Sequence, residues 1–326
     1  MKLDKHGRFI GRRLRNDRFF QLILVLLVAS VVWWSLDLSG FGSLGGAGDK
    51  TGHVQHEDLT EISGIVTSRR NPDVIWAHND SGGIARVFAM KTDGTHLGVF
   101  PLAGARAIDW EDIAIGPGPT PRINYLYIAD TGNNNLTRTT LTIYRIPEPR
   151  LEGERTRDTQ SPEKAEALSF RFPGSPHECE TLLVDPLTGD LYLITRDRNT
   201  VRQEAALVFR SAAPQESGAT RTLELVASFS PVASIKGGDI SPDGQMILLR
   251  AHSPQKRDKA LLWQRPAGKA PLADAFRSAP VDVPVRDEPQ GEAIAFSPDG
   301  DYFFTIGEGL GAPIYRYKLP RAEPEQ

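Results

Sequence analysis

One pattern recurs along most of the chain: an apolar run, a short turn rich in Pro, Gly, Asn or Asp, and a second apolar run. The last copy reads GEAIAFSPDGDYFFTIGEG, from Gly291. Asp-Gly and Thr-Gly-Asp corners between apolar runs predict β-hairpins, because glycine supplies the positive φ that a tight turn needs. One or two further strand-like runs follow each hairpin, such as ARVFAMK and LTIYRIP. The copies begin at Glu61, Trp110, Cys179, Lys236 and Gly291.

Aligning the first apolar runs places Ser63, Glu111, Glu180, Lys236 and Glu292 at equivalent positions, 48 to 69 residues apart. Four-stranded units at about this spacing are typical of β-propeller blades. We therefore predict an all-β fold, a five-bladed β-propeller over residues 58–320. Six blades are the alternative if the charged insertion RLEGERTRDTQSPEK hides one. A β-sandwich is less favoured, because its strands would not repeat in sequence this way.

The last unit has about three strands before the chain ends. We expect its outermost strand to come from the stretch before Glu61, which would close the ring without a long exposed edge. The aromatic residues Trp76, Tyr127, Tyr192 and Phe304 fall in the middle of predicted strands. We expect these four side chains in the core between blades.

The N-terminal residues have a different character. Residues 1–18 carry seven basic and two acidic side chains, whereas residues 19–36, FFQLILVLLVASVVWWSL, carry no charge. This run approaches the length that a helix needs to cross a hydrocarbon core of about 30 Å, and its paired tryptophans suit the membrane interface. We expect a basic cytoplasmic segment at 1–18, a transmembrane signal anchor at 19–36, a Gly-rich linker at 37–57 and a disordered tail at 321–326.

This arrangement predicts a single-pass inner-membrane protein with its N-terminus in the cytoplasm and its propeller periplasmic or extracellular. A protein secreted after signal cleavage is the alternative. The whole chain has a net charge of −3 although its first 18 residues are basic, so the remainder is acidic, which argues against a nucleic-acid partner. A single cysteine, Cys179, excludes an intrachain disulfide and a zinc site built from cysteines.

The SPDG corners at 241–244 and 297–300 resemble the WD40-like repeats of bacterial propellers of the TolB type. Together with HNDSG at 78–82, DWEDIA at 109–114 and CETLLVDPLTGDLYLITRD at 179–197, they make the chain similar to a family of uncharacterised exported bacterial β-propellers. More distantly, the chain is similar to the esterase-like phytase propellers. The resemblance covers about residues 58–320 and implies a propeller fold, and the phytase likeness implies phosphoester or ester hydrolysis.

Propeller topology also predicts where polar residues converge. The first two strands of a blade are antiparallel, so the start of the first and the end of the second lie on one face of the disc, at one mouth of the central channel. HECE at 177–180 places Glu178 and Glu180 on one side of a strand, and is a poor zinc site. The candidate ligand-binding residues at this mouth are Asn79, Asp80, Trp110, Glu111, Asp130, Glu180, Arg196, Lys236, Arg250, Glu292 and Glu308.

Three ligands compete for this mouth. Calcium suits the clustered carboxylates, with Glu111, Glu180 and Glu292 as the metal ligands. A small anionic ligand suits the Arg and Lys side chains. A protein or peptide partner is a common use of a propeller face. We expect binding rather than catalysis, with a divalent-cation-assisted phosphoester or ester hydrolase as the alternative, in which Arg196 and Arg250 hold the anion.

Structural roles compete with each of these functional ones. Each acid could cap backbone amides at the start of a blade or pair with a neighbouring Arg. Trp110 is placed equally well for stacking on a ligand and for packing between blades.

Overall fold

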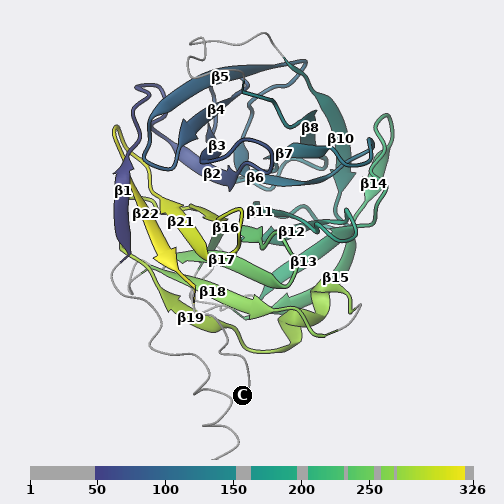
Figure 1. The fold of residues 1–326 in the computed structure, drawn as a ribbon. Coiled ribbons are helices and arrows are strands. Elements are labelled where there is room, and N and C mark those ends of the chain that lie inside the picture. Colours follow the sequence, from purple (N-terminus) through teal and green to yellow (C-terminus); the bar gives the residue numbers. More distant parts are fainter. Residues whose placement is uncertain are drawn as a thin grey trace, which may run out of the picture. The chain divides into compact units, whose positions relative to one another are not determined.

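The computed structural model describes residues 48–151, 163–196, 205–230, 234–252, 258–267 and 270–319. These residues form five sheets arranged around a common centre, each a twisted blade of antiparallel strands (Figure 1). The predicted basic segment, membrane anchor and C-terminal tail lie outside the described residues. Among the described residues, no helix combines the length and hydrophobicity that crossing a membrane would take.

The first blade contains β2 (Ile62–Thr67), β3 (Val74–Asn79), β4 (Arg86–Lys91) and β5 (His96–Ala103). The second contains β6 (Trp110–Pro117), β7 (Asn124–Asp130), β8 (Leu141–Pro147) and β10 (Glu166–Arg171). The third contains β11 (Cys179–Val184), β12 (Leu191–Thr195), β13 (Ala206–Ser211) and β15 (Glu224–Phe229). The fourth contains β16 (Ser234–Ile240), β17 (Met246–His252), β18 (Lys259–Gln264) and β19 (Val281–Pro284), with the 3-10 helix η1 (Leu272–Arg277) before β19.

The fifth blade closes the ring. It contains β20 (Ala293–Phe296), β21 (Tyr302–Ile306) and β22 (Pro313–Lys318), and its outer strand is β1 (Asp49–His53) from the other end of the described chain. β1 runs antiparallel to β22, with Lys50 opposite Tyr315 (Figure 1). The expectation that the last blade borrows its outermost strand from before Glu61 is confirmed.

The inner strands meet in the order β2, β6, β11, β16 and β20, and β20 meets β2. The prediction of an all-β propeller with five blades is therefore confirmed. Two short strands also cross between blades at the outer edge. β9 (Glu163–Lys164) adds to β5 of the first blade, and β14 (Thr220–Thr222) adds to β10 of the second, both as parallel pairs.

The core lies between neighbouring blades. Every residue of β2, β11 and β16 is buried, because both faces of an inner strand pack against adjacent strands of other blades. The four aromatic residues expected in this core, Trp76, Tyr127, Tyr192 and Phe304, are all buried, which confirms that prediction.

Candidate functional site: the channel mouth

Four inner strands have a β-bulge at their start, and the bulged residue of each lies at the mouth. The strand pairing shifts between Ile62 and Gly64, Trp110 and Asp112, Cys179 and Thr181, and Ile235 and Gly237. Such bulges place one extra residue in a strand and re-aim its side chain. The extra residues are Ser63, Glu111, Glu180 and Lys236. In the fifth blade, Glu292 directly precedes β20, so the five residues aligned by sequence occupy the same place in their blades.

Two of the three aligned glutamates are neutralised by basic side chains. The Lys236 ammonium pairs with Glu292 and lies 3.1 Å from Oε2 of Glu180. The Arg196 guanidinium pairs with the other oxygen of Glu180. Ser63 Oγ lies 3.3 Å from Oε2 of Glu292 and donates a hydrogen bond to it. The ion pairs of Lys236 with Glu180 and Glu292 link the third, fourth and fifth blades. The hydrogen bond of Ser63 adds the first blade.

Glu111 is the exception. Its side chain is buried, with the residue 5% exposed, yet no described residue hydrogen-bonds to its carboxylate or forms an ion pair with it. One oxygen of Glu111 lies within 4.8 Å of carboxylate oxygens of Asp80 and Asp109, and another such group joins Glu111 with Glu178 and Glu180. Burial, followed by repulsion from Glu180 and Asp80, raises the pKa of Glu111 well above its usual range.

The excess of negative charge extends to the rim of the mouth. Burial and then the nearby carboxylate of Asp109 raise the pKa of the half-buried Asp80 to about 7. Burial and then the carboxylate of Glu292 raise the pKa of Glu308 to about 7, although Gln290 Nε2 donates a hydrogen bond of 2.5 Å to it. Both groups therefore change protonation near neutral pH, where an ordinary carboxyl is fully ionised.

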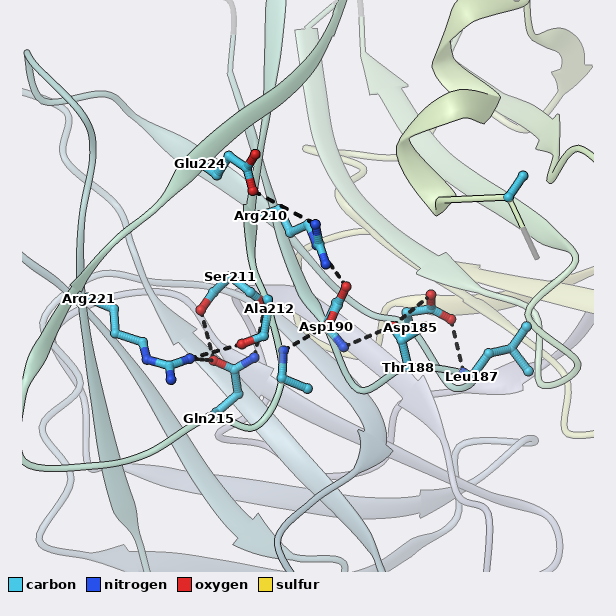
Figure 2. A network of polar contacts seen from close by, with 12 residues as sticks. Asp185, Leu187, Thr188, Asp190, Arg210, Ser211, Ala212, Gln215, Arg221 and Glu224 are labelled. Atoms are coloured by element: carbon cyan, nitrogen blue, oxygen red, sulfur yellow. Dashed lines mark hydrogen bonds and ion pairs between the residues drawn. The ribbon is translucent and has the colours of Figure 1, made fainter.

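Two acids at the other end of the third blade, Asp185 and Asp190, each accept hydrogen bonds from an arginine; Figure 2 shows the contact of Asp190 with Arg210. Asp190 accepts a hydrogen bond of 2.8 Å from Arg210 Nε and another of 2.8 Å from the backbone of Ala213. Asp185 receives two nitrogens of Arg265, at 3.0 and 2.8 Å. Because each of these carboxylates faces a guanidinium, the clustering of carboxylates around Glu111 is a local feature and not a general property of the fold.

Arg250 is not an open anion-binding residue. Its side chain is 0% exposed and lies between Asp258, at 3.0 Å from Nη2, and Glu288, at 2.8 Å from Nη1. The segment that connects β19 to β20 supplies Glu288, so the guanidinium joins the fourth and fifth blades below the surface. The prediction that Arg250 holds an anion stays a prediction, and the structure places its guanidinium between two buried carboxylates.

Glu292 differs from the other proposed metal ligands. Glu111 and Glu180 share one carboxylate group with Glu178, whereas Glu292 belongs to neither carboxylate group. The predicted metal-ligand set of Glu111, Glu180 and Glu292 stays a prediction, and Glu178 is the acid that the structure places beside the first two.

Asn79 and Asp130 hold loops near the mouth. Asn79 Oδ1 accepts a hydrogen bond of 3.2 Å from the backbone of Glu61, and its Nδ2 donates one of 2.6 Å to the carbonyl of Asp58. The fully buried Asp130 pairs with Nη1 of Arg138 at 2.8 Å. Burial nevertheless raises the pKa of Asp130. These contacts give both residues a structural role at the ends of second strands.

Trp110 packs between blades and does not project from the mouth. It is almost fully buried, its Nε1 donates a hydrogen bond of 2.9 Å to the carbonyl of Arg106, and its ring meets His78 edge-on at 5.7 Å. One edge still reaches a shallow pocket of about 30 Å³, which Asp80 and Ile84 also line.

Asp109 and Glu178 complete the two carboxylate groups, although neither was among the site residues predicted from the sequence. Both precede their inner strands by one residue, next to Trp110 and Cys179 respectively. The signal was present, because DWED and HECE place a second acid two residues before the aligned glutamate. Two carboxylates at that spacing lie on the same side of an extended chain.

Exposed apolar side chains gather on the same face. The connections between second and third strands, and those that lead into each inner strand, lie at the mouth. Among large apolar side chains of the described part, Ile84, Ile108, Leu136 and Leu310 are exposed on such connections. Single exposed apolar residues need no explanation, but four around a charged mouth make a mixed surface of the kind that protein interfaces use.

Comparison with known proteins adds little beyond the geometry. No protein-family model and no curated protein sequence matches this chain. Among solved structures, one described as "Structure of U3-55K" overlaps with a TM-score of 0.41 at 10% identity, covering 82% of this chain and 98% of that one. Another, described as "Crystal structure of RRP9 WD40 repeats", overlaps with a TM-score of 0.41 at 12% identity, covering 84% and 99%. The fold assignment rests on the sheets and their ring.

Proposed function

We propose that this protein is a membrane-anchored, extracytoplasmic binding propeller whose channel mouth docks a protein partner. The partner presents a lysine or arginine to the acidic mouth and packs apolar side chains against the surrounding loops. The observation that carries the proposal is the excess of carboxylates over basic side chains at the mouth. Binding a cationic group offsets the repulsion that this excess creates.

The charge imbalance supports a cationic partner. Lys236 and Arg196 pair with Glu180 and Glu292 at the mouth, and Arg138 pairs with the neighbouring Asp130. Acids remain in excess even after these pairs form. The pKa values of Asp80 and Glu308 are raised first by burial and then by neighbouring carboxylates. The carboxylates in question are Glu61, Asp80, Asp109, Glu111, Glu178, Glu180, Glu292 and Glu308.

The exposed loops support a protein as the source of that cation. Ile84 and Leu310 lie beside Asp80 and Glu308 in sequence, on the connections that follow β3 and β21. A small inorganic cation would leave these apolar side chains in water, whereas a peptide could cover them. Interfaces commonly combine a central charged anchor with an apolar surround.

The pairing of the arginines favours binding over hydrolysis. The hydrolase hypothesis assigns Arg196 and Arg250 to a substrate anion. Arg196 is paired with Glu180, and Arg250 is enclosed between Asp258 and Glu288. An incoming anion would have to displace carboxylates from both guanidiniums.

The proposed membrane location rests on the apolar run at 19–36 and the basic residues before it.

Selection from a random-peptide display library, on the immobilised full-length protein in EDTA, tests this function. We expect the selected peptides to be enriched in Lys or Arg next to Leu, Ile or Phe. The double variant Asp80→Asn/Glu308→Gln should weaken their binding about tenfold, which corresponds to about 1.4 kcal/mol. Binding should also weaken as salt concentration rises.

The matched control removes two charges away from the mouth. Glu163→Gln/Glu224→Gln changes side chains on outer strands of the blades and should leave peptide affinity unchanged. Selected peptides without basic residues, or equal affinity for the Asp80→Asn/Glu308→Gln variant and the native protein, would refute the proposed docking site.

A further inference from the structure

We propose that Glu111, Glu178 and Glu180, here termed the inner triad, bind one divalent cation of the calcium class. The site lies beneath the docking surface, where the second and third blades meet, and goes beyond the proposed partner binding. It differs from the rim acids Asp80 and Glu308, because all three members of the inner triad are buried.

Glu111 is a buried carboxylate for which the described residues provide no hydrogen bond and no basic partner. A buried carboxylate is normally held by hydrogen bonds or by a basic partner, since burying an isolated charge is costly. Glu111 has neither among the described residues, and its neighbours are themselves acids. A cation would balance several of these carboxylates at once.

The carboxylate oxygens of the inner triad are spaced like the ligands of a single ion. One oxygen from each member of the inner triad lies within 4.8 Å of the other two. Calcium binds carboxylate oxygens at about 2.3–2.6 Å, so oxygens on one ion stand at most about 5 Å apart. The carboxylates are therefore already as close as ligands of one ion, although no hydrogen bond or bridging base holds Glu111 there.

Glu178 and Glu180, the other two members of the inner triad, are held in place by their own contacts. Glu178 Oε2 accepts a hydrogen bond of 2.8 Å from the backbone of Asn133. Glu180 is held by Arg196 and by Lys236. Such supporting contacts fix ligand direction around metal ions. Asp80 and Asp109 approach Glu111 from the other side and offer further oxygen ligands.

The ligand chemistry selects a hard cation. Neither carboxylate group contains histidine or cysteine, and oxygen-only sites favour calcium, magnesium or manganese over zinc and copper. Calcium accepts an irregular oxygen set, whereas magnesium demands a near-octahedral one and retains several waters. Carboxylates contributed by two different blades fit calcium better.

Thermal melting of the full-length protein in detergent, after treatment with EDTA and then with CaCl₂ or MgCl₂, tests the site. At calcium about a hundredfold above its Kd, the Tm should rise by about 5 °C or more. Equilibrium dialysis with radioactive calcium should give one ion per chain. Magnesium should act more weakly at equal concentration.

The variant Glu111→Gln should abolish the calcium-dependent rise in Tm. In EDTA this variant should be at least as stable as the native protein, because a neutral amide removes repulsion from Glu180 and Asp80. That second measurement separates loss of a ligand from failure to fold. Glu308→Gln makes the same chemical change on the rim and should retain the calcium response.

Two results would overturn the site: no calcium bound in dialysis together with no Tm shift, or a native-like calcium response in Glu111→Gln. Peptide selection in EDTA is independent of this ion, so the docking surface and the cation site can fail separately.

Discussion

Replacing Arg250 with methionine is expected to lower the free energy of unfolding by about 3–5 kcal/mol. The guanidinium is fully buried between Asp258 and Glu288, both of which are buried as well. Methionine fills a similar volume but leaves Glu288 without its guanidinium partner and Asp258 with His252 alone, at 2.7 Å. Losing one partner of a buried ion pair is far more damaging than replacing the whole pair.

Urea denaturation followed by circular dichroism measures this loss. Arg277→Met is the matched control, because Arg277 is 82% exposed and pairs with Asp274 at 3.1 Å on η1. Exposed pairs of this kind contribute about 0–1 kcal/mol. The triple variant Arg250→Met/Asp258→Asn/Glu288→Gln should recover part of the stability. A loss below about 1 kcal/mol in Arg250→Met would show that the buried pairs do not hold the fourth and fifth blades together.

Deleting residues 1–53 is expected to lower the Tm by roughly 10 °C or more and to promote association between chains. The deletion removes β1, so the edge of β22 loses its partner and the ring is no longer closed by strand pairing. β1 also packs tightly against the turn after β4. A Cβ on Gly52 would lie 1.8 Å from the carbonyl oxygen of Asp93.

The shorter deletion of residues 1–47 keeps β1 and provides the control. It should melt like the full-length protein and elute as a monomer in size-exclusion chromatography. It should also leave the membrane fraction, since it removes the proposed anchor at 19–36. Equal Tm values for the two deletions would mean that β1 does not close the ring, and membrane retention of the shorter deletion would argue against the anchor.

The blades could be predicted from sequence because their signals are local. An Asp-Gly corner such as the one at Gly300, with φ of 72°, fixes a hairpin through the backbone freedom of one residue. The repeated pair of short strands around such a corner makes each blade recognisable along the sequence. The borrowed strand β1 followed from counting strands, because a propeller must pair its last edge. The cross-blade strands β9 and β14 carry no comparable local signal.

The positions of the mouth residues were predictable, but their states were not. Glu111 and Glu292 occupy equivalent places in their blades, yet Lys236 neutralises Glu292 while acids surround Glu111. The difference arises from the neighbouring blades, whose side chains come from residues about 30 to 70 positions away. For the same reason, Arg250 could be placed near the mouth by topology while its enclosure by Asp258 and Glu288 could not be foreseen.

A ¹³C NMR titration of the side-chain carboxyl groups, in protein freed of multivalent cations, tests most directly whether carboxylates exceed basic side chains at the mouth. Asp80 and Glu308 should titrate with pKa values of about 7, and the single variants Asp80→Asn and Glu308→Gln assign their signals. A selected basic peptide should lower both values, because a nearby cation favours the ionised form. Titration of both groups near their ordinary values of about 4 would contradict the account.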